Sequence, residues 1–146
     1  MKKILFVIAL LFAGIATANA SPERPITIDQ LPKTAQEFLA AHFKDLTVAY
    51  AVAEQKFTGT EYEVVYTDRT EVDFRSDGQW DSVERKYSAI PDSIVPQQIR
   101  DFVAKNNYPG QFIKKIERNA YTWEIELSSD IEIKFDVHFN VIDIDD

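Results

Sequence analysis

The sequence contains no cysteine, only four glycines, and two histidines. Without cysteine there can be no disulfide framework, no thiolate metal site and no acylated N-terminal cysteine. So few glycines leave little backbone to wrap a phosphate group, and there is no nucleophile elbow, phosphate-binding loop or His-Glu-x-x-His motif. The histidines, His42 and His138, have no ligand-spaced neighbour. We therefore predict no catalytic residue, no cofactor and no metal ligand, and we expect a hydrophobic core to supply the stability.

The first twenty residues, "MKKILFVIALLFAGIATANA", have the order of a secretory signal peptide. Lys2 and Lys3 precede an apolar run that ends at Ile15, and small residues lead to Ala20. The apolar run is shorter than the ~20 residues that a membrane-spanning helix needs. The sequence therefore predicts cleavage after Ala20 and export to the periplasm, without membrane insertion of the mature chain. Residues 21–146 fit a single domain.

Acidic residues outnumber basic ones by 24 to 16, which gives a formal net charge of −8. This balance argues against nucleic acid as a partner and mildly favours a cationic partner. The alternative is that the charge only keeps an exported protein in solution.

An internal repeat is the most informative feature of the sequence. "LPKTAQEFLAAHF" (31–43) aligns with "VPQQIRDFVAKNN" (95–107), proline on proline and Phe38 on Phe102. Both segments have the apolar spacing of a short amphipathic helix, with a proline suited to the first turn. The predicted N-terminal caps are Asp29 in the first helix and Asp92 or Ser93 in the second.

A second alignment joins residues 61–84 to residues 122–145 without a gap. Apolar and polar residues alternate in both segments, as they do in antiparallel strands with one packed face and one wet face. Residues 47–57 and 111–118 are predicted as the first strand of each copy, and residues 79–87 and 139–145 as the last. The predicted fold is α+β: a tandem (αββββ)×2 repeat, about 27–87 and 88–146, with two short helices on one face of a continuous antiparallel sheet.

Tandem helix-plus-four-strand units with apolar-Pro helix starts, and strands such as "YEVV" and "TEVDFRSDGQWDSVE", resemble the PepSY-like family of periplasmic proteins. These proteins are similar in fold to the β-lactamase inhibitor protein. The resemblance implies a sheet face that acts as a docking surface, with inhibition of another protein as its role. It carries over no catalytic motif, so the function expected is that of a non-enzymatic binding protein, an inhibitor or chaperone of another exported protein.

The outward strand positions supply the candidate partner-binding residues. They would form an acidic platform with basic residues interspersed. The alternative is that these positions are charged only because this face of the sheet is exposed to water. We expect these carboxylates to be solvated, which argues against a pair in different environments that could do acid–base catalysis. The predicted residues are Glu61, Glu63, Glu71, Asp73, Arg75, Glu124, Glu126 and Glu132.

The stretch "DFRSDGQWDSVE" (73–84) nearly matches a calcium-binding EF-hand loop. A calcium or cation binder using this loop or the acidic face is therefore the alternative function. However, alternating strands flank the stretch where an EF-hand has helices, and Arg75 would place a cation among the ligands. The sequence favours a tight hairpin turn at Asp77 and Gly78, with glycine supplying a positive φ.

Overall fold

The computed structural model describes residues 23–106, 108 and 110–146. They form an α+β fold with one open antiparallel sheet of nine strands, whose spatial order is the chain order. The strands are β1 (Glu23–Ile26), β2 (Val48–Lys56), β3 (Gly59–Tyr66), β4 (Thr70–Phe74), β5 (Trp80–Arg85), β6 (Ile113–Arg118), β7 (Thr122–Leu127), β8 (Glu132–Asp136) and β9 (Val141–Asp145). The helices are α1 (Lys33–His42) and α2 (Gln97–Lys105), with a 3-10 turn, η1, at Ile28–Gln30.

Both predicted helices and all eight predicted strands are present, and each helix is followed by four strands. The first strand, β1, was not predicted, because four residues that include Pro25 carry too little alternation to indicate a strand. The predicted signal peptide and its cleavage site lie outside the described residues. None of the helices that the described residues form has the length and apolar character needed to cross a membrane.

The predicted helix caps are wrong. Pro32 and Pro96 themselves occupy the N-cap positions, and neither helix has a side-chain cap hydrogen bond. Asp29 lies inside η1, where the Thr27 hydroxyl donates a hydrogen bond to its carboxylate. A capping side chain must stand at the N-cap itself to accept from the N–H groups of the first turn, and Asp29, Asp92 and Ser93 lie three or four residues before Pro32 and Pro96.

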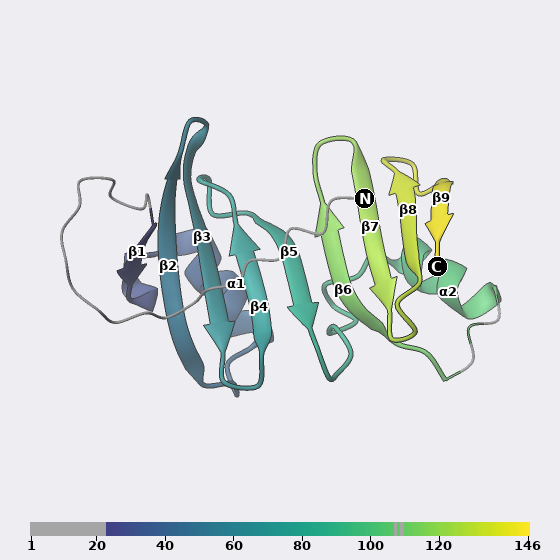
Figure 1. The fold of residues 1–146 in the computed structure, drawn as a ribbon, viewed down its shortest axis with the longest axis horizontal. Coiled ribbons are helices and arrows are strands. Elements are labelled where there is room, and N and C mark those ends of the chain that lie inside the picture. The colour runs from purple at the N-terminus through teal and green to yellow at the C-terminus, as the bar shows by residue number, and fades with distance from the viewer. Residues whose placement is uncertain (1–22, 107, 109) are drawn as a thin grey trace.

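Both helices lie behind the same face of the sheet, α1 behind the first strands and α2 behind the last (Figure 1). We call this side the helix face and the opposite side the open face. Ala35 and Leu39 of α1 and Ile99 of α2 are buried, as their spacing predicted. Phe38 and Phe102 reach the sheet, where their rings contact Phe74 and Phe135 edge-on at 5.9 and 5.4 Å between centroids. Aromatic contacts of this geometry add to the area that burial alone stabilises.

One row of aliphatic side chains crosses the helix face of all nine strands, and we call it the central row. Each member is the direct cross-strand neighbour of the next, so all of them point to the same side. The row consists of Ile26, Ala51, Val64, Val72, Val83, Ile116, Ile125, Ile133 and Ile144. It is buried from Ile26, at 9% exposure, through Ile133, at 0%. Burial of each large aliphatic side chain stabilises the fold by about 1.5–3 kcal/mol, and this continuous row joins the two halves of the sheet.

The hairpin predicted at Asp77 and Gly78 is confirmed. It joins β4 to β5, with Gly78 N–H donating to Arg75 O at 2.9 Å and Gly78 at φ 82°. The loop is longer than the expected two residues, because Arg75 N–H also bonds to Gln79 O across a three-residue tip. A Cβ on Gly78 would lie 2.9 Å from Pro32 Cβ, so the turn packs directly against the start of α1.

The β8–β9 turn has the same hydrogen bonds 61 residues later. Asp136 N–H donates to Asn140 O, Phe139 N–H donates to Asp136 O, and Phe139 takes the position of Gly78 with φ 63°. The β3–β4 and β7–β8 turns match in the same way, with Arg69 at φ 67° and Asp130 at φ 71°. These turns therefore have matching backbone conformations even where a glycine is replaced by another residue.

Candidate functional site

The open face carries two rows of polar side chains that run across most of the sheet. One row includes Glu63, Asp73, Ser82, Glu117, Glu124, Lys134 and Asp143. The other includes Glu71, Glu84, Lys115, Glu126, Glu132 and Asp145. Direct cross-strand neighbours lie about 4.5–5.5 Å apart at Cβ, so charges in a row interact with one another.

Four carboxylates on β3, β4 and β5 form what we call the acidic cluster: Glu63, Glu71, Asp73 and Asp81. Glu63 and Asp73 are direct cross-strand partners. Among residues 23–106, 108 and 110–146, no lysine or arginine comes within ion-pairing distance of any of these four carboxylates. The cluster thus concentrates negative charge that these residues do not neutralise by contact.

Burial and mutual repulsion raise the pKa values in the acidic cluster. Burial, followed by the charges of Glu63 and Asp81, raises the pKa of Asp73 to about 8. Burial and then Glu71 raise the pKa of Glu63 to about 7, and burial and then Glu61 raise that of Asp81 to about 6. The pKa of Glu71 is raised by burial and by Glu84. Near neutral pH the cluster therefore holds protons that isolated carboxyl groups would have released.

The expectation that the carboxylates on this face are all solvated is wrong for Glu63, Asp73 and Asp81, which are half-buried. Neighbouring side chains on a crowded sheet shield them, an effect that alternation along single strands does not reveal. All four shifts nevertheless have the same direction and the same main cause. Glycosidase-like chemistry needs two carboxyl groups whose pKa values differ, so that one acts as an acid and the other as a base. This arrangement does not favour such a separation.

The carboxylates on β6 and β7 have lysine partners, and we call this part of the open face the paired region. Glu117 contacts Lys115 at 2.8 Å and Glu126 contacts Lys114 at 3.1 Å. Lys134 of β8 reaches Glu124 at 3.3 Å. Negative charge on β6 and β7 is therefore compensated locally, as it is not in the acidic cluster. Glu132 on β8 forms no ion pair within the described residues, and burial, Glu124 and Glu126 raise its pKa.

Six of the eight predicted binding residues come together in two groups on the open face, and the other two lie apart from them. Glu63, Glu71 and Asp73 come together in the acidic cluster, and Glu124, Glu126 and Glu132 lie together on β7 and β8. Glu61 stands on β3 but pairs with Lys56 at 2.6 Å. Arg75 lies in the hairpin after β4, where its Nε is 3.6 Å from the Asp77 carboxylate.

Sequence reasoning missed Asp81 and the contribution of β6. Asp81 precedes Ser82 on β5, and the pairing of β5 with β4 shifts register between Asp73 and Phe74 of β4. Two consecutive polar residues therefore separate the buried Trp80 and Val83 on β5. That doublet was the available signal for a bulge. Glu117 and Lys115 join the site only because β6 pairs with β5, which neither alignment could show.

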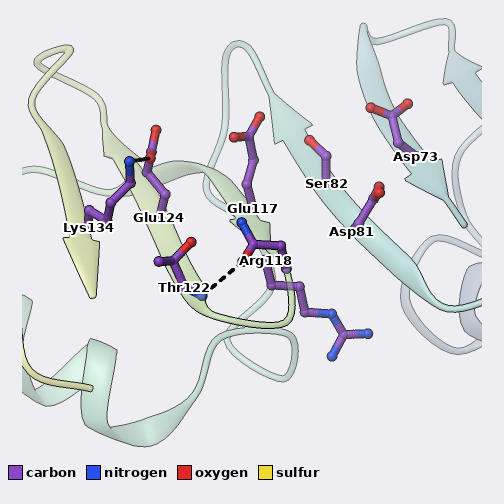
Figure 2. A pocket seen from close by; sticks show the side chains of 9 residues that line it. Asp73, Asp81, Ser82, Glu117, Arg118, Thr122, Glu124 and Lys134 are labelled. Carbon is purple, nitrogen blue, oxygen red and sulfur yellow. Dashed lines mark hydrogen bonds and ion pairs between the residues drawn. The ribbon is translucent and has the colours of Figure 1, made fainter. Parts of the chain in front are cut away.

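A shallow depression of about 300 Å³ lies where the acidic cluster meets the paired region. Figure 2 shows Asp73 and Asp81 on one side of it and Glu117, Glu124 and Lys134 on the other. Arg118 also lines it, but the guanidinium points away and lies over the Trp80 ring at 4.0 Å. The depression is polar, so it fits charged groups better than an apolar ligand.

The twelve residues of the calcium-like stretch do not converge. Asp73 lies on β4, Asp77 in the hairpin and Glu84 on β5 beside Glu71. Asp77 Oδ1 instead accepts a hydrogen bond from Gln79 N–H at 2.9 Å. In the part of the chain that the structure describes, no group of three or more His, Cys, Asp or Glu side chains is placed to hold a metal ion.

Comparison with known proteins agrees with the family resemblance. The profile of the family described as putative beta-lactamase-inhibitor-like, PepSY-like matches residues 60–143. A search of curated proteins gives no significant match. The chain belongs to the PepSY-like family.

The solved structures that are similar over most of this chain include three from Bacteroides. A putative periplasmic protein of the DUF2874 family from Bacteroides vulgatus is 44% identical, with a TM-score of 0.83 over 87% of this chain and 99% of that one. A putative calcium-regulated periplasmic protein from Bacteroides thetaiotaomicron is 40% identical, with a TM-score of 0.81 over 85% and 97%. A putative periplasmic protein of unknown function from Bacteroides vulgatus is 31% identical, with a TM-score of 0.79 over 85% and 99%.

Proposed function

We propose that this chain is a periplasmic, non-enzymatic binding protein that docks another exported protein on its open face. The acidic cluster is the observation that supports the proposal most strongly. Holding Glu63, Asp73 and Asp81 half-buried without contacting cations lowers the stability of the folded protein at neutral and higher pH. A basic segment of a partner would compensate these charges on binding, and rigid strands hold them in place for it.

The export route is part of the proposal. A signal peptide cleaved after Ala20 would deliver the chain to the periplasm, and the similar structures are described as periplasmic proteins. Mass spectrometry of the protein recovered from the periplasm tests this route. A mature N-terminus at Ser21 is the expected result, and an intact Met1 in the cytoplasm would contradict it.

We also propose that the chain is a duplicated αββββ unit with the architecture of the β-lactamase inhibitor protein. The two alignments in the sequence and the matching turns 61 residues apart support the duplication. The family description supports the likeness to the inhibitor.

Affinity capture from periplasmic extract tests the docking role when the two parts of the open face are compared. One variant carries Glu63→Gln, Asp73→Asn and Asp81→Asn, and its matched control carries Glu117→Gln, Glu124→Gln and Glu126→Gln. Each variant removes three carboxylates, but only the first removes carboxylates without lysine partners. We expect the first variant to lose a specific partner by roughly tenfold or more, and the control to lose less.

Equal recovery of the partner by both variants, or recovery of no specific partner by the unaltered chain, would contradict the proposal. Once the partner is captured, an assay of its activity and folding distinguishes an inhibitor from a chaperone. An inhibitor lowers the activity of the partner, whereas a chaperone raises the yield of folded partner.

Calcium binding is the second candidate, because one similar structure is described as a putative calcium-regulated protein. The acidic cluster, rather than the Asp73–Glu84 stretch as a loop, is the surface that could attract a cation. A melting temperature that rises by several degrees with calcium and not with magnesium would favour this function. No calcium-specific shift would leave protein docking as the better proposal.

A further inference from the structure

The two edges of the sheet differ in how they are protected. β1 has four residues, and its Pro25 lacks the N–H that a further strand would need. β9 reads VIDID and contains neither proline nor lysine, two residues that commonly block an edge. Its register shifts at Lys134 and Phe135, so Ile142 is an extra residue, but Asp143, Ile144 and Asp145 follow in regular register.

The central row ends uncovered at β9. Ile133 is completely buried, yet its direct neighbour Ile144 is 50% exposed, whereas Ile26 at the opposite end of the row is 9% exposed. Ile142 and Val137 nearby are also about half exposed, at 54% and 49%. Within the described residues β9 pairs only with β8. The buried part of the central row therefore ends at β8, whereas its apolar side chains continue onto β9.

The open-face side of β9 carries only negative charge. Asp143 extends the row that contains Lys134, and Asp145 extends the row that contains Glu132. A strand added beside β9 would place side chains directly opposite Asp143, Ile144 and Asp145. The complementary sequence is basic, apolar, basic. A second copy of β9 does not satisfy this requirement, because pairing two VIDID strands would bring aspartates close to aspartates.

We propose that β9 is a docking edge for an extended segment of a partner protein in which basic and apolar residues alternate, and that this segment adds a tenth strand to the sheet. Main-chain hydrogen bonds would supply affinity, while Ile144 and the two aspartates would set the register. α2 lies behind β8 and β9 on the helix face, so an apolar residue opposite Ile144 would point to the helix side (Figure 1). The edge does not include the acidic cluster, so each can be tested separately.

Binding of short synthetic peptides to the full chain, followed by fluorescence anisotropy, tests the edge. The probe is a labelled peptide of about seven residues, the length of a strand, in which Lys and Val alternate. The control peptide has the same lysines and one central Val replaced by Pro, which retains the charge but breaks strand pairing. We expect the probe to bind and the proline peptide to bind about tenfold more weakly or worse.

Protein variants then locate the bound peptide. Asp143→Lys with Asp145→Lys should weaken the probe by about tenfold or more, and Ile144→Thr should weaken it by a smaller factor. Glu37→Lys with Asp45→Lys, which changes the net charge equally at exposed sites near α1, should leave binding unchanged. Circular dichroism checks that the variants fold. If the variant with both aspartates changed to lysine does not fold, the milder Ile144→Thr still tests the proposal.

The edge proposal would be overturned by equal binding of the proline peptide, by no binding of the probe to the unaltered chain, or by binding that the β9 variants do not change. If binding instead depends on Glu63→Gln and Asp73→Asn, the peptide occupies the acidic cluster, so the edge proposal fails while docking on the open face stands. Reversible dimers that Asp143→Lys with Asp145→Lys abolish would also overturn it, because a second copy would then be the occupant.

Discussion

The two halves of the sheet have the same order of elements, one helix followed by four strands, but their carboxylates differ in how they are compensated. In β3 to β5, four carboxylates gather without contacting cations, and their pKa values rise. In β6 to β8, lysines contact Glu117, Glu124 and Glu126 at 2.8 to 3.3 Å. The same fold therefore supports a compensated surface and an uncompensated one. The difference indicates that the acidic cluster is not a requirement of the architecture.

The turn before the last strand of each half shows a second difference between the two halves. Gly78 and Phe139 hold equivalent places with a positive φ, but only Gly78 lies against α1. Phe139 instead packs beside Trp123, with ring centroids 5.9 Å apart. One half therefore needs glycine for space as well as for φ, and the other half tolerates a side chain.

The largest expected effect comes from Gly78→Ala. The new Cβ would meet Pro32 and Thr34 at 2.9 and 3.2 Å while the residue remains at φ 82°, so we expect a loss of about 2–4 kcal/mol. Chemical denaturation measures the loss. Gly110→Ala is the control. Gly110 also has a positive φ, but among the described residues, its chain neighbours apart, no atom would lie within 4 Å of the added Cβ, so the substitution should cost about 1 kcal/mol. Equal losses would show that φ alone matters at Gly78.

The next effect distinguishes the two parts of the open face. Asp73→Asn removes a carboxyl group whose ionisation the fold opposes, and we expect a gain of about 1–2 kcal/mol at pH 8 after allowance for solvent screening. Glu124→Gln removes the contact with Lys134 and should lower stability by up to about 1 kcal/mol. A stabilising Glu124→Gln, or a destabilising Asp73→Asn at that pH, would contradict the contrast.

The pH dependence follows from the sign of these shifts. The folded-state pKa of Asp73, about 8, is above the ordinary value of 3.8, so the folded protein retains a proton that the unfolded chain releases. Stability from this group is complete below the ordinary pKa and is lost as the pH rises through the folded-state value. The unfolding free energy should therefore fall between about pH 4 and pH 8, and less steeply in Asp73→Asn. Denaturation at several pH values checks both slopes.

The smallest effect tests strain in the β3–β4 turn. Arg69 is exposed and adopts φ 67°, a region that Asn enters more readily than Arg. Arg69→Asn should therefore raise the unfolding free energy by about 0.5 kcal/mol. Arg69→Ala, which keeps the unfavourable φ, should show no such gain in thermal melts. A matching gain in Ala would mean that the arginine side chain, rather than φ, was responsible.

Most of the fold could be predicted because it depends on local patterns. Alternation in "TWEIEL" and helical spacing in "QQIRDFVAK" follow from which side chains must avoid water, and both elements formed where they were expected. β1 and the proline caps escaped prediction, because a four-residue edge strand and a helix entry depend on the neighbours against which they pack.

The candidate site was less predictable. Glu63, Glu71 and Asp73 were found because they alternate with core residues, but Asp81 was hidden by a bulge. Their raised pKa values depend on crowding from adjacent strands, which no single strand reveals.

The sequence by itself determined the α+β class, the positions of both helices and of strands β2 to β9, and the hairpin at Asp77 and Gly78, because these depend on periodicity and on the φ that glycine permits. Only the tertiary structure decided which carboxylates obtained lysine partners and which were left together. It also left Ile144 uncovered at the end of the central row. Those outcomes depend on the pairing of β5 with β6 and on where the sheet ends, and both are contacts between segments distant in the chain.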